Sequence, residues 1–159
     1  MCSGFEGTVT GDSEKYGGFT GYLSGNMIGC YAVASVTGSN NTGGLVGYVF
    51  GSNNSLSASY FKGSVTCSNT YAGLIAGYVT KSSFGMDYAY YHQDGGNVTV
   101  AAGNKIEFAG FKAVSNWNDA IIDMNSKIGD TYKYKYVWDE TKQHPVSVSY
   151  THLRAHETA

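Results

Sequence analysis

Charge is scarce in this sequence. Only 14% of its 159 residues are charged and the formal net charge is −2, whereas about a quarter of an average domain is charged. Proteins that bind nucleic acid carry a basic patch that contacts phosphates, so this composition argues against nucleic acid as a partner. No apolar run is long enough to span a bilayer, and we expect no membrane insertion.

Cysteine and proline are also rare. Cys2, Cys30 and Cys67 are odd in number and form no Cys-x-x-Cys pair, which argues against a disulfide framework and a zinc site. The first residues lack the basic and apolar segments of a signal peptide, so we expect the chain to be an internal fragment. A single proline beside 22 glycines and 14 tyrosines favours strands joined by tight turns.

What the sequence does contain is a glycine-rich repeat. Residues 16–23 read YGGFTGYL, residues 42–49 read TGGLVGYV and residues 72–79 read AGLIAGYV. A second element precedes each copy, at 5–10, 33–37 and 61–66, and a degenerate fourth copy of it lies at 94–99. The period from Gly21 to Gly47 is 26 residues, and from Gly47 to Gly77 it is 30. Periods of this size are typical of repeat architectures.

The repeat predicts an all-β fold, a parallel β-solenoid over residues 1–102. Each unit holds short strands that cannot bury an apolar face alone, and stacking coil on coil buries it against the next copy. Alternation along 45–49 places Leu45, Gly47 and Val49 on one face, which we expect to point inward, and Val46 and Tyr48 on the other. The inward glycine then occupies a place where a side chain does not fit.

These residues resemble the GLUG motif family, named for its Gly-Leu-Xaa-Gly core. Residues 44–47 match the core outright, residues 18–21 replace leucine with Phe19, and residues 74–77 depart at the first glycine. The resemblance covers roughly residues 3–100. It implies a secreted or surface protein of bacteria, a group that includes adhesin-like proteins and the non-catalytic parts of metallopeptidases that cleave IgA.

Residues 103–147 follow a different pattern. Their apolar residues are spaced as one stripe of a helix, from Val114 through Trp117, Ile121 and Met124 to Ile128. The alternation at 132–138 predicts a half-buried strand, and 144–146 opens another. A solenoid needs to cover the open end of its core, and we expect this helix and its strands to form that C-terminal cap.

The last residues are not expected to be native protein. Residues 148–158 read VSYTHLRAHET, which resembles the translation of a transposon-end sequencing adapter, and Arg154 is the only arginine of the chain. We therefore treat 148–159 as a translated adapter tail and exclude it from the fold, as one does for a fusion scar.

No constellation of residues predicts catalysis. The His-Glu-x-x-His pattern of zinc peptidases is absent. Asp87, His92 and Asp94 lie close in sequence, but a polar turn between strands explains them better than a metal or acid–base site. Asp139 and Glu140 form an adjacent acidic pair, which we place in a hairpin turn. We expect no catalytic residue, no metal site and no cofactor.

Tyrosines are the best candidates for a binding role. Tyr22, Tyr48 and Tyr78 share one position of the repeat and are expected to stack as a column. Facing outward, they would offer an aromatic strip to sugar rings or to a protein; packed under a loop, they would be a structural ladder, the interpretation that we favour.

The sequence thus favours a non-catalytic, extracellular or cell-surface adhesion module, a spacer or a binding stalk, with host glycans or surface proteins as partners. Two alternatives stay open. One is a glycan-binding module that uses the tyrosine column, and the other is an accessory region of a larger secreted peptidase or glycosidase.

Overall fold

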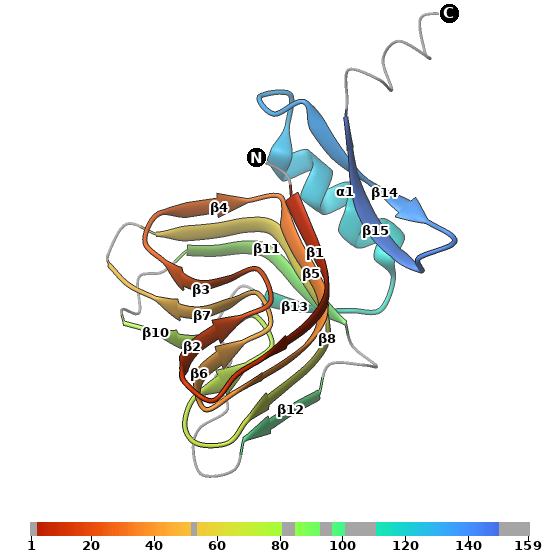
Figure 1. Cartoon of the computed structure of the whole chain (residues 1–159). Helices are drawn as coiled ribbons and strands as arrows, with labels where there is room; N and C mark the ends of the chain where they lie inside the picture. Colours follow the sequence, from red (N-terminus) through yellow and green to blue (C-terminus); the bar gives the residue numbers. More distant parts are fainter. Residues whose placement is uncertain (1–2, 52–53, 81–84, 93–96, 101–110, 150–159) are drawn as a thin grey trace, which may run out of the picture.

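The computed structural model describes residues 3–51, 54–80, 85–92, 97–100 and 111–149. These residues are mostly β-structure, with a single helix among them (Figure 1). In chain order the elements are β1 (Ser3–Thr10), β2 (Glu14–Gly17), β3 (Thr20–Leu23), β4 (Asn26–Ile28), β5 (Cys30–Gly38), β6 (Asn40–Gly43), β7 (Val46–Val49), β8 (Ser55–Cys67), β9 (Ala72–Gly73), β10 (Ala76–Val79), β11 (Gly85–His92), β12 (Asn97–Val100), β13 (Phe111–Val114), α1 (Trp117–Ile128), β14 (Tyr134–Asp139) and β15 (His144–Ser149).

The strands up to β13 pair in three sheets, and every pairing in them is parallel. The largest has the order β1-β5-β8-β11-β13, with β4 and β12 also paired to β8; the others are β2-β6-β9 and β3-β7-β10. The chain passes through one strand of each sheet and returns to the first sheet one strand further along (Figure 1). We call these three sheets the strand stack.

The register of the strand stack confirms the repeat residue by residue. Val36 pairs with Val9 on one side and with Val65 on the other, and Tyr48 pairs with Tyr22 and Tyr78. The expected fourth copy is confirmed for the residues that the structure describes, because β12 pairs with β8 in the matching register. Equivalent positions of the repeat are therefore neighbours in space.

The core lies between the three sheets. Its fully buried side chains include Val36, Leu45, Leu56, Phe61 and Val65, and burying each such side chain stabilises the fold by about 1.5–3 kcal/mol. The equivalent residues of the first strands are only partly buried, among them Phe5, Val9, Phe19 and Leu23. They lie at the edge of the stack, where β1 and β3 have a parallel neighbour on one side only.

Glycines let two of the sheets approach closely. A Cβ built on Gly47 would lie 2.7 Å from the carbonyl carbon of Lys15, 2.7 Å from the amide nitrogen of Tyr16 and 2.8 Å from the carbonyl oxygen of Gly21. A Cβ on Gly77 would meet the backbone of Asn41 and Thr42 in the same way. Backbone therefore packs on backbone here, as expected where no side chain fits.

The expected outward position of Val46 is wrong. Val46 is fully buried in the same core as Leu45 and Val49. The amides of Leu45 and Val46 both donate to the carbonyl of Ile75, at 3.0 and 2.9 Å. Two successive amides that share one acceptor mark a bend, and the bend interrupts the alternation of side chains.

The predicted helix is present, but it starts later than the predicted apolar stripe, which began at Val114. α1 begins after Asn116, whose side chain accepts a hydrogen bond from the amide of Asn118, and it ends at Gly129, where φ is 62°. It buries Ala120, Met124 and Ile128. Val114 lies in β13 instead of the helix, because the N-cap at Asn116 starts the helix after it.

The remaining two strands form a hairpin. β14 and β15 pair antiparallel, from Tyr134 opposite Ser149 to Asp139 opposite His144. Val148 and Ser149, which we assigned to the adapter tail, are thus paired residues of β15. The rest of that tail, 150–159, lies outside the described residues. We refer to α1, β14 and β15 together as the C-terminal unit.

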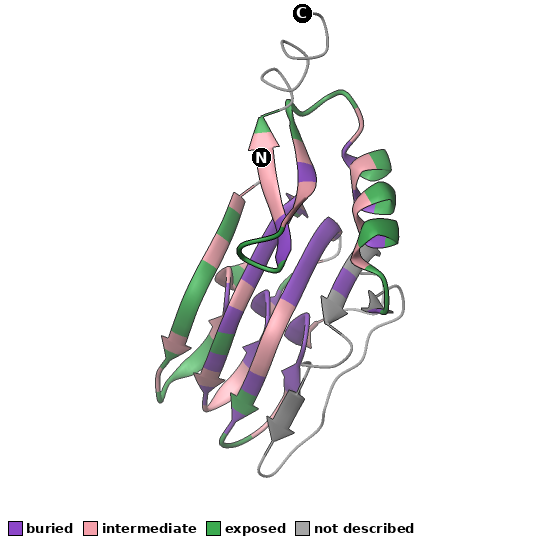
Figure 2. Cartoon of the chain, turned by 90° about the vertical axis from the view of Figure 1, so that its right-hand side faces the viewer, coloured by how far each residue is buried: buried purple, intermediate pink, exposed green. Residues whose placement is uncertain are grey.

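The C-terminal unit covers a face of the large sheet, whereas we expected it to cover the end of the stack. In Figure 1 it stands beside β1, β5 and β8, on the side away from β3 and β7, and α1 contacts β8 and β11. Figure 2, coloured by burial, shows the helix with an exposed outer side and a buried inner one. The physical reason is a second apolar surface on the outer face of the sheet, where Tyr31, Tyr60 and Tyr90 pack under the unit.

Candidate functional site

The predicted tyrosine column exists. The rings of Tyr22 and Tyr48 stack with centroids 5.8 Å apart and planes 9° apart, and those of Tyr48 and Tyr78 stack at 5.4 Å and 18°. This follows from the register, because parallel pairing in β3-β7-β10 places the three residues side by side on one face. We keep the name tyrosine column for these three residues.

The column directs its ring faces along the stack. Tyr48 has a tyrosine on each side, and Phe50 stacks on Tyr22 at 6.2 Å. Tyr71 meets Tyr78 edge-on at 4.8 Å. The two neighbouring rings therefore occupy both faces of the Tyr48 ring, whereas a sugar ring needs an open aromatic face.

A lysine lies over the column. Lys15 Nζ is 4.9 Å from the ring centre of Tyr48 and 5.6 Å from that of Tyr22, which is the range of a cation–π contact. Tyr22 is the most accessible member at 46% exposure. The arrangement has the features of a surface ladder: stacked rings, partial burial and a cation that holds the rings from outside.

The adjacent acidic pair, Asp139 and Glu140, lies where β14 ends and the chain turns toward β15. Asp139 Oδ1 accepts hydrogen bonds from the amides of Thr141 and Lys142, each at 2.9 Å, which is the work of a turn residue. Gln143 Nε2 binds the Glu140 carboxylate at 3.2 Å. The Asp87 and His92 side chains, and all of Asp94, fall outside the described residues.

The described residues contain no group of three metal-binding side chains. Their one helix, α1, is not long and apolar enough to cross a bilayer.

A second set of stacked tyrosines was not foreseen. Tyr60 pairs with Tyr31 and Tyr90 in the large sheet, and the Tyr31 and Tyr60 rings stack at 5.1 Å with planes only 1° apart. All three are buried beneath the C-terminal unit, and Tyr90 donates to Asp123 of α1 at 3.1 Å. We call this set the buried tyrosine ladder. Its spacing of 29 and 30 residues is a signal that the sequence does contain.

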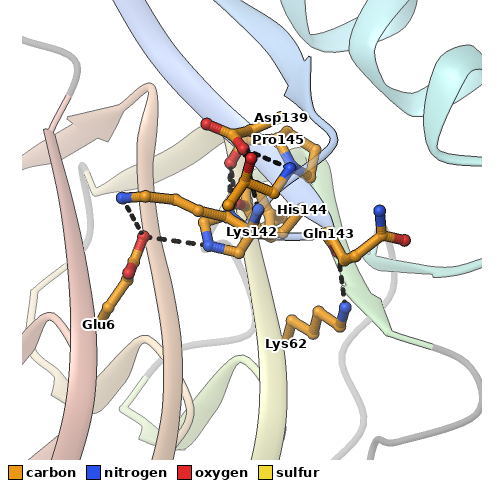
Figure 3. Close-up of polar contacts among 9 residues, drawn as sticks. Glu6, Lys62, Asp139, Lys142, Gln143, His144 and Pro145 are labelled. Carbon is orange, nitrogen blue, oxygen red and sulfur yellow. Dashed lines mark hydrogen bonds and ion pairs between the residues drawn. The ribbon is translucent and has the colours of Figure 1, made fainter.

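A polar cluster joins the hairpin to the strand stack (Figure 3). Buried His144 lies with Nε2 3.0 Å from Glu6 Oε1 and Nδ1 3.0 Å from the Tyr60 hydroxyl. Tyr60 also donates to the carbonyl of Pro145, and Lys142 Nζ binds Glu6 Oε1 at 3.0 Å. No sequence pattern indicates these contacts, because Glu6 lies at the other end of the chain.

Two phenols and one lysine of this region hold their protons more tightly than usual. Burial, with smaller contributions from Tyr31 and Glu6, raises the pKa of Tyr60 far above its ordinary range. Burial and Glu6 also raise the pKa of Tyr31. The hydrogen bond to Glu6 raises the pKa of Lys142.

We compared the chain with family models, curated proteins and solved structures. None of them matches it.

Proposed function

We propose that the strand stack is a parallel β-solenoid and that the chain is a non-catalytic extracellular surface or adhesion module, a spacer or binding stalk. The observation that carries the proposal is the register, in which equivalent residues of successive repeats pair directly in three parallel sheets. Such a stack grows in one direction by about 4.8 Å per coil. Added repeats lengthen it without changing its cross-section, which suits a spacer.

The placement outside the cell rests on the composition and on the GLUG resemblance. Low charge and many Gly, Ser, Asn and Thr residues are compatible with a surface repeat. Host glycans and surface proteins remain the partners that we propose.

In this proposal the tyrosine column is a structural ladder. Each stacked aromatic pair stabilises a fold by about 0.5–1.5 kcal/mol beyond its buried area, and Tyr48 takes part in two such pairs. The second candidate, a glycan-binding strip, is favoured by the 46% exposure of Tyr22, but both faces of the Tyr48 ring are already occupied. The third, an accessory region of a larger peptidase or glycosidase, is compatible with the same fold.

The experiment replaces Tyr48 by alanine, with Tyr48→Phe as the matched control that keeps the ring. A ladder predicts a lower melting temperature for Tyr48→Ala, a nearly unchanged one for Tyr48→Phe, and unchanged binding of both to a glycan array. A glycan strip predicts that Tyr48→Ala loses array binding while its melting temperature holds. Turnover of a peptide or glycoside substrate by the purified chain would overturn the non-catalytic proposal.

A further inference from the structure

A cleft opens where the start of α1 meets the end of the hairpin. It has a volume of about 370 Å³ and is lined by Ser115, Asn116, Trp117, Asn118, Trp138 and Glu140. The chain has only two tryptophans, and both line it. We call it the tryptophan cleft; it belongs to the C-terminal unit and shares no residue with the tyrosine column.

The walls of the tryptophan cleft are held in place by the fold. Trp117, the first residue of α1, packs edge-on against Tyr60 of the buried tyrosine ladder, with ring centres 5.0 Å apart. Trp138 lies on β14 opposite Pro145 of β15. Both residues are half-buried, so part of each side chain reaches solvent. A wall fixed before binding saves the entropy of ordering it.

Two polar side chains of the cleft are held by hydrogen bonds. Asn116 Oδ1 accepts from the backbone amide of Asn118 at 2.9 Å, which fixes the Asn116 side chain at the start of the helix. The Glu140 carboxylate is bound by Gln143 Nε2 at 3.2 Å. A carboxylate has about four acceptor sites, and one such bond leaves it able to accept hydroxyl hydrogens from a ligand.

This combination of groups fits a sugar. Ligand sites are concave, of about 300–1,000 Å³, with aromatic walls and a few oriented polar groups. A pyranose with equatorial hydroxyls has a flat C–H face that packs on an indole ring, while its rim of hydroxyls needs carboxamide and carboxylate partners. The Glu140 charge, with Asp119 and Asp139 close in sequence, opposes an anionic ligand.

We propose that the tryptophan cleft is a binding site for a neutral saccharide of β-linked pyranose units with equatorial hydroxyls. The proposal goes beyond the surface-module function and does not depend on it, because the cleft would bind sugar whether the strand stack is a spacer or an accessory arm. It assigns glycan recognition to the C-terminal unit instead of the tyrosine column.

The two tryptophans make the test direct, since the fluorescence of the chain reports on this cleft. We expect titration of the full chain with chitotetraose or cellotetraose to give a saturable emission change and protection from acrylamide quenching. Sialyllactose, which is anionic, and sorbitol, which has no ring, should give neither. Losing a hydrogen bond in the cleft weakens binding about tenfold, so Asn118→Ala and Glu140→Gln should each show that loss.

The matched control is Glu14→Gln, which changes an exposed glutamate of β2 outside the cleft and should bind like the parent chain. Melting curves of each variant verify that it is folded. The proposal is overturned if neither neutral tetrasaccharide changes the fluorescence of the folded chain, or if Asn118→Ala and Glu140→Gln bind as tightly as Glu14→Gln. Saturable binding of a proline-rich peptide in place of sugar would also overturn it. Tyr48 does not line the cleft, so its variants and the cleft variants change different sites and the two proposals fail separately.

Discussion

His144 Nε2 lies 3.0 Å from Glu6 Oε1, and this contact ties the last strand of the chain to the first. A carboxylate only accepts hydrogen bonds, so Nε2 is the donor in this contact. His144 is 3% exposed. A buried donor that loses its acceptor costs about 1–3 kcal/mol, so a single change in this pair should weaken the attachment of the C-terminal unit.

Glu6→Ala should therefore lower the free energy of unfolding by about 1–3 kcal/mol. The substitution removes the acceptor of His144 Nε2 and the partner of Lys142. Urea denaturation followed by circular dichroism measures the change. Glu14→Ala, at an exposed glutamate of β2, is the control and should cost little. Equal effects of the two substitutions would mean that the contact with His144 does not hold the hairpin.

The buried tyrosine ladder predicts a loss of stability in alkali. Burial raises the pKa of Tyr60 above the ordinary value of 10.0, so the folded chain keeps a proton that the unfolded chain releases above about pH 10. Stability should be unaffected by this group below that pH. Above it, stability should fall by up to about 1.4 kcal/mol per pH unit for each such tyrosine.

Denaturation midpoints measured between pH 9 and about pH 11.5 give the change in the free energy of unfolding per pH unit. Tyr60→Phe should be less stable at neutral pH, because His144 and Pro145 lose the hydroxyl, yet its stability should fall less steeply above about pH 10. Parallel slopes for the parent and the variant would show that Tyr60 ionises as readily in the folded state as in the unfolded one.

Gly47→Val tests the close approach of the glycine-bearing strands. The new side chain would collide with the backbone of β2 and β3, which cannot move aside as a flexible side chain can. We expect destabilisation of at least about 1–3 kcal/mol, seen as a lower melting temperature. Thr8→Val introduces the same side chain at an exposed position of β1 and should have little effect. An unchanged melting temperature for Gly47→Val would contradict the packing described here.

The parts of the fold that repeat could be predicted from the sequence. The pairing of Val36 with Val9 and Val65, and that of the tyrosine column, follows from aligning the copies, because parallel stacking makes equivalent residues of successive repeats neighbours in space. The helix followed from its apolar spacing. The buried position of Val46 could not be predicted, because it depends on a bend that forms when the Val46 amide donates to the carbonyl of Ile75.

The parts that join distant segments could not be predicted. The contact between Glu6 and His144 combines two residues with no pattern around either of them, and the tryptophan cleft needs the helix start to meet the hairpin end. The buried tyrosine ladder was detectable by its period. Its role was hidden, because the sequence does not indicate that a second apolar surface covers the outside of the large sheet.

The close approach at the glycines has a consequence for how such a chain can vary. The spacing from Gly17 to Gly21 is kept from Gly43 to Gly47 and from Gly73 to Gly77, while the connection after β7 is longer than the one after β3. Inserted residues are thus absorbed in a peripheral connection, and the paired strands keep their register. In a chain built in this way, segments inserted at this connection would lie on the surface at regular intervals, one for each repeat.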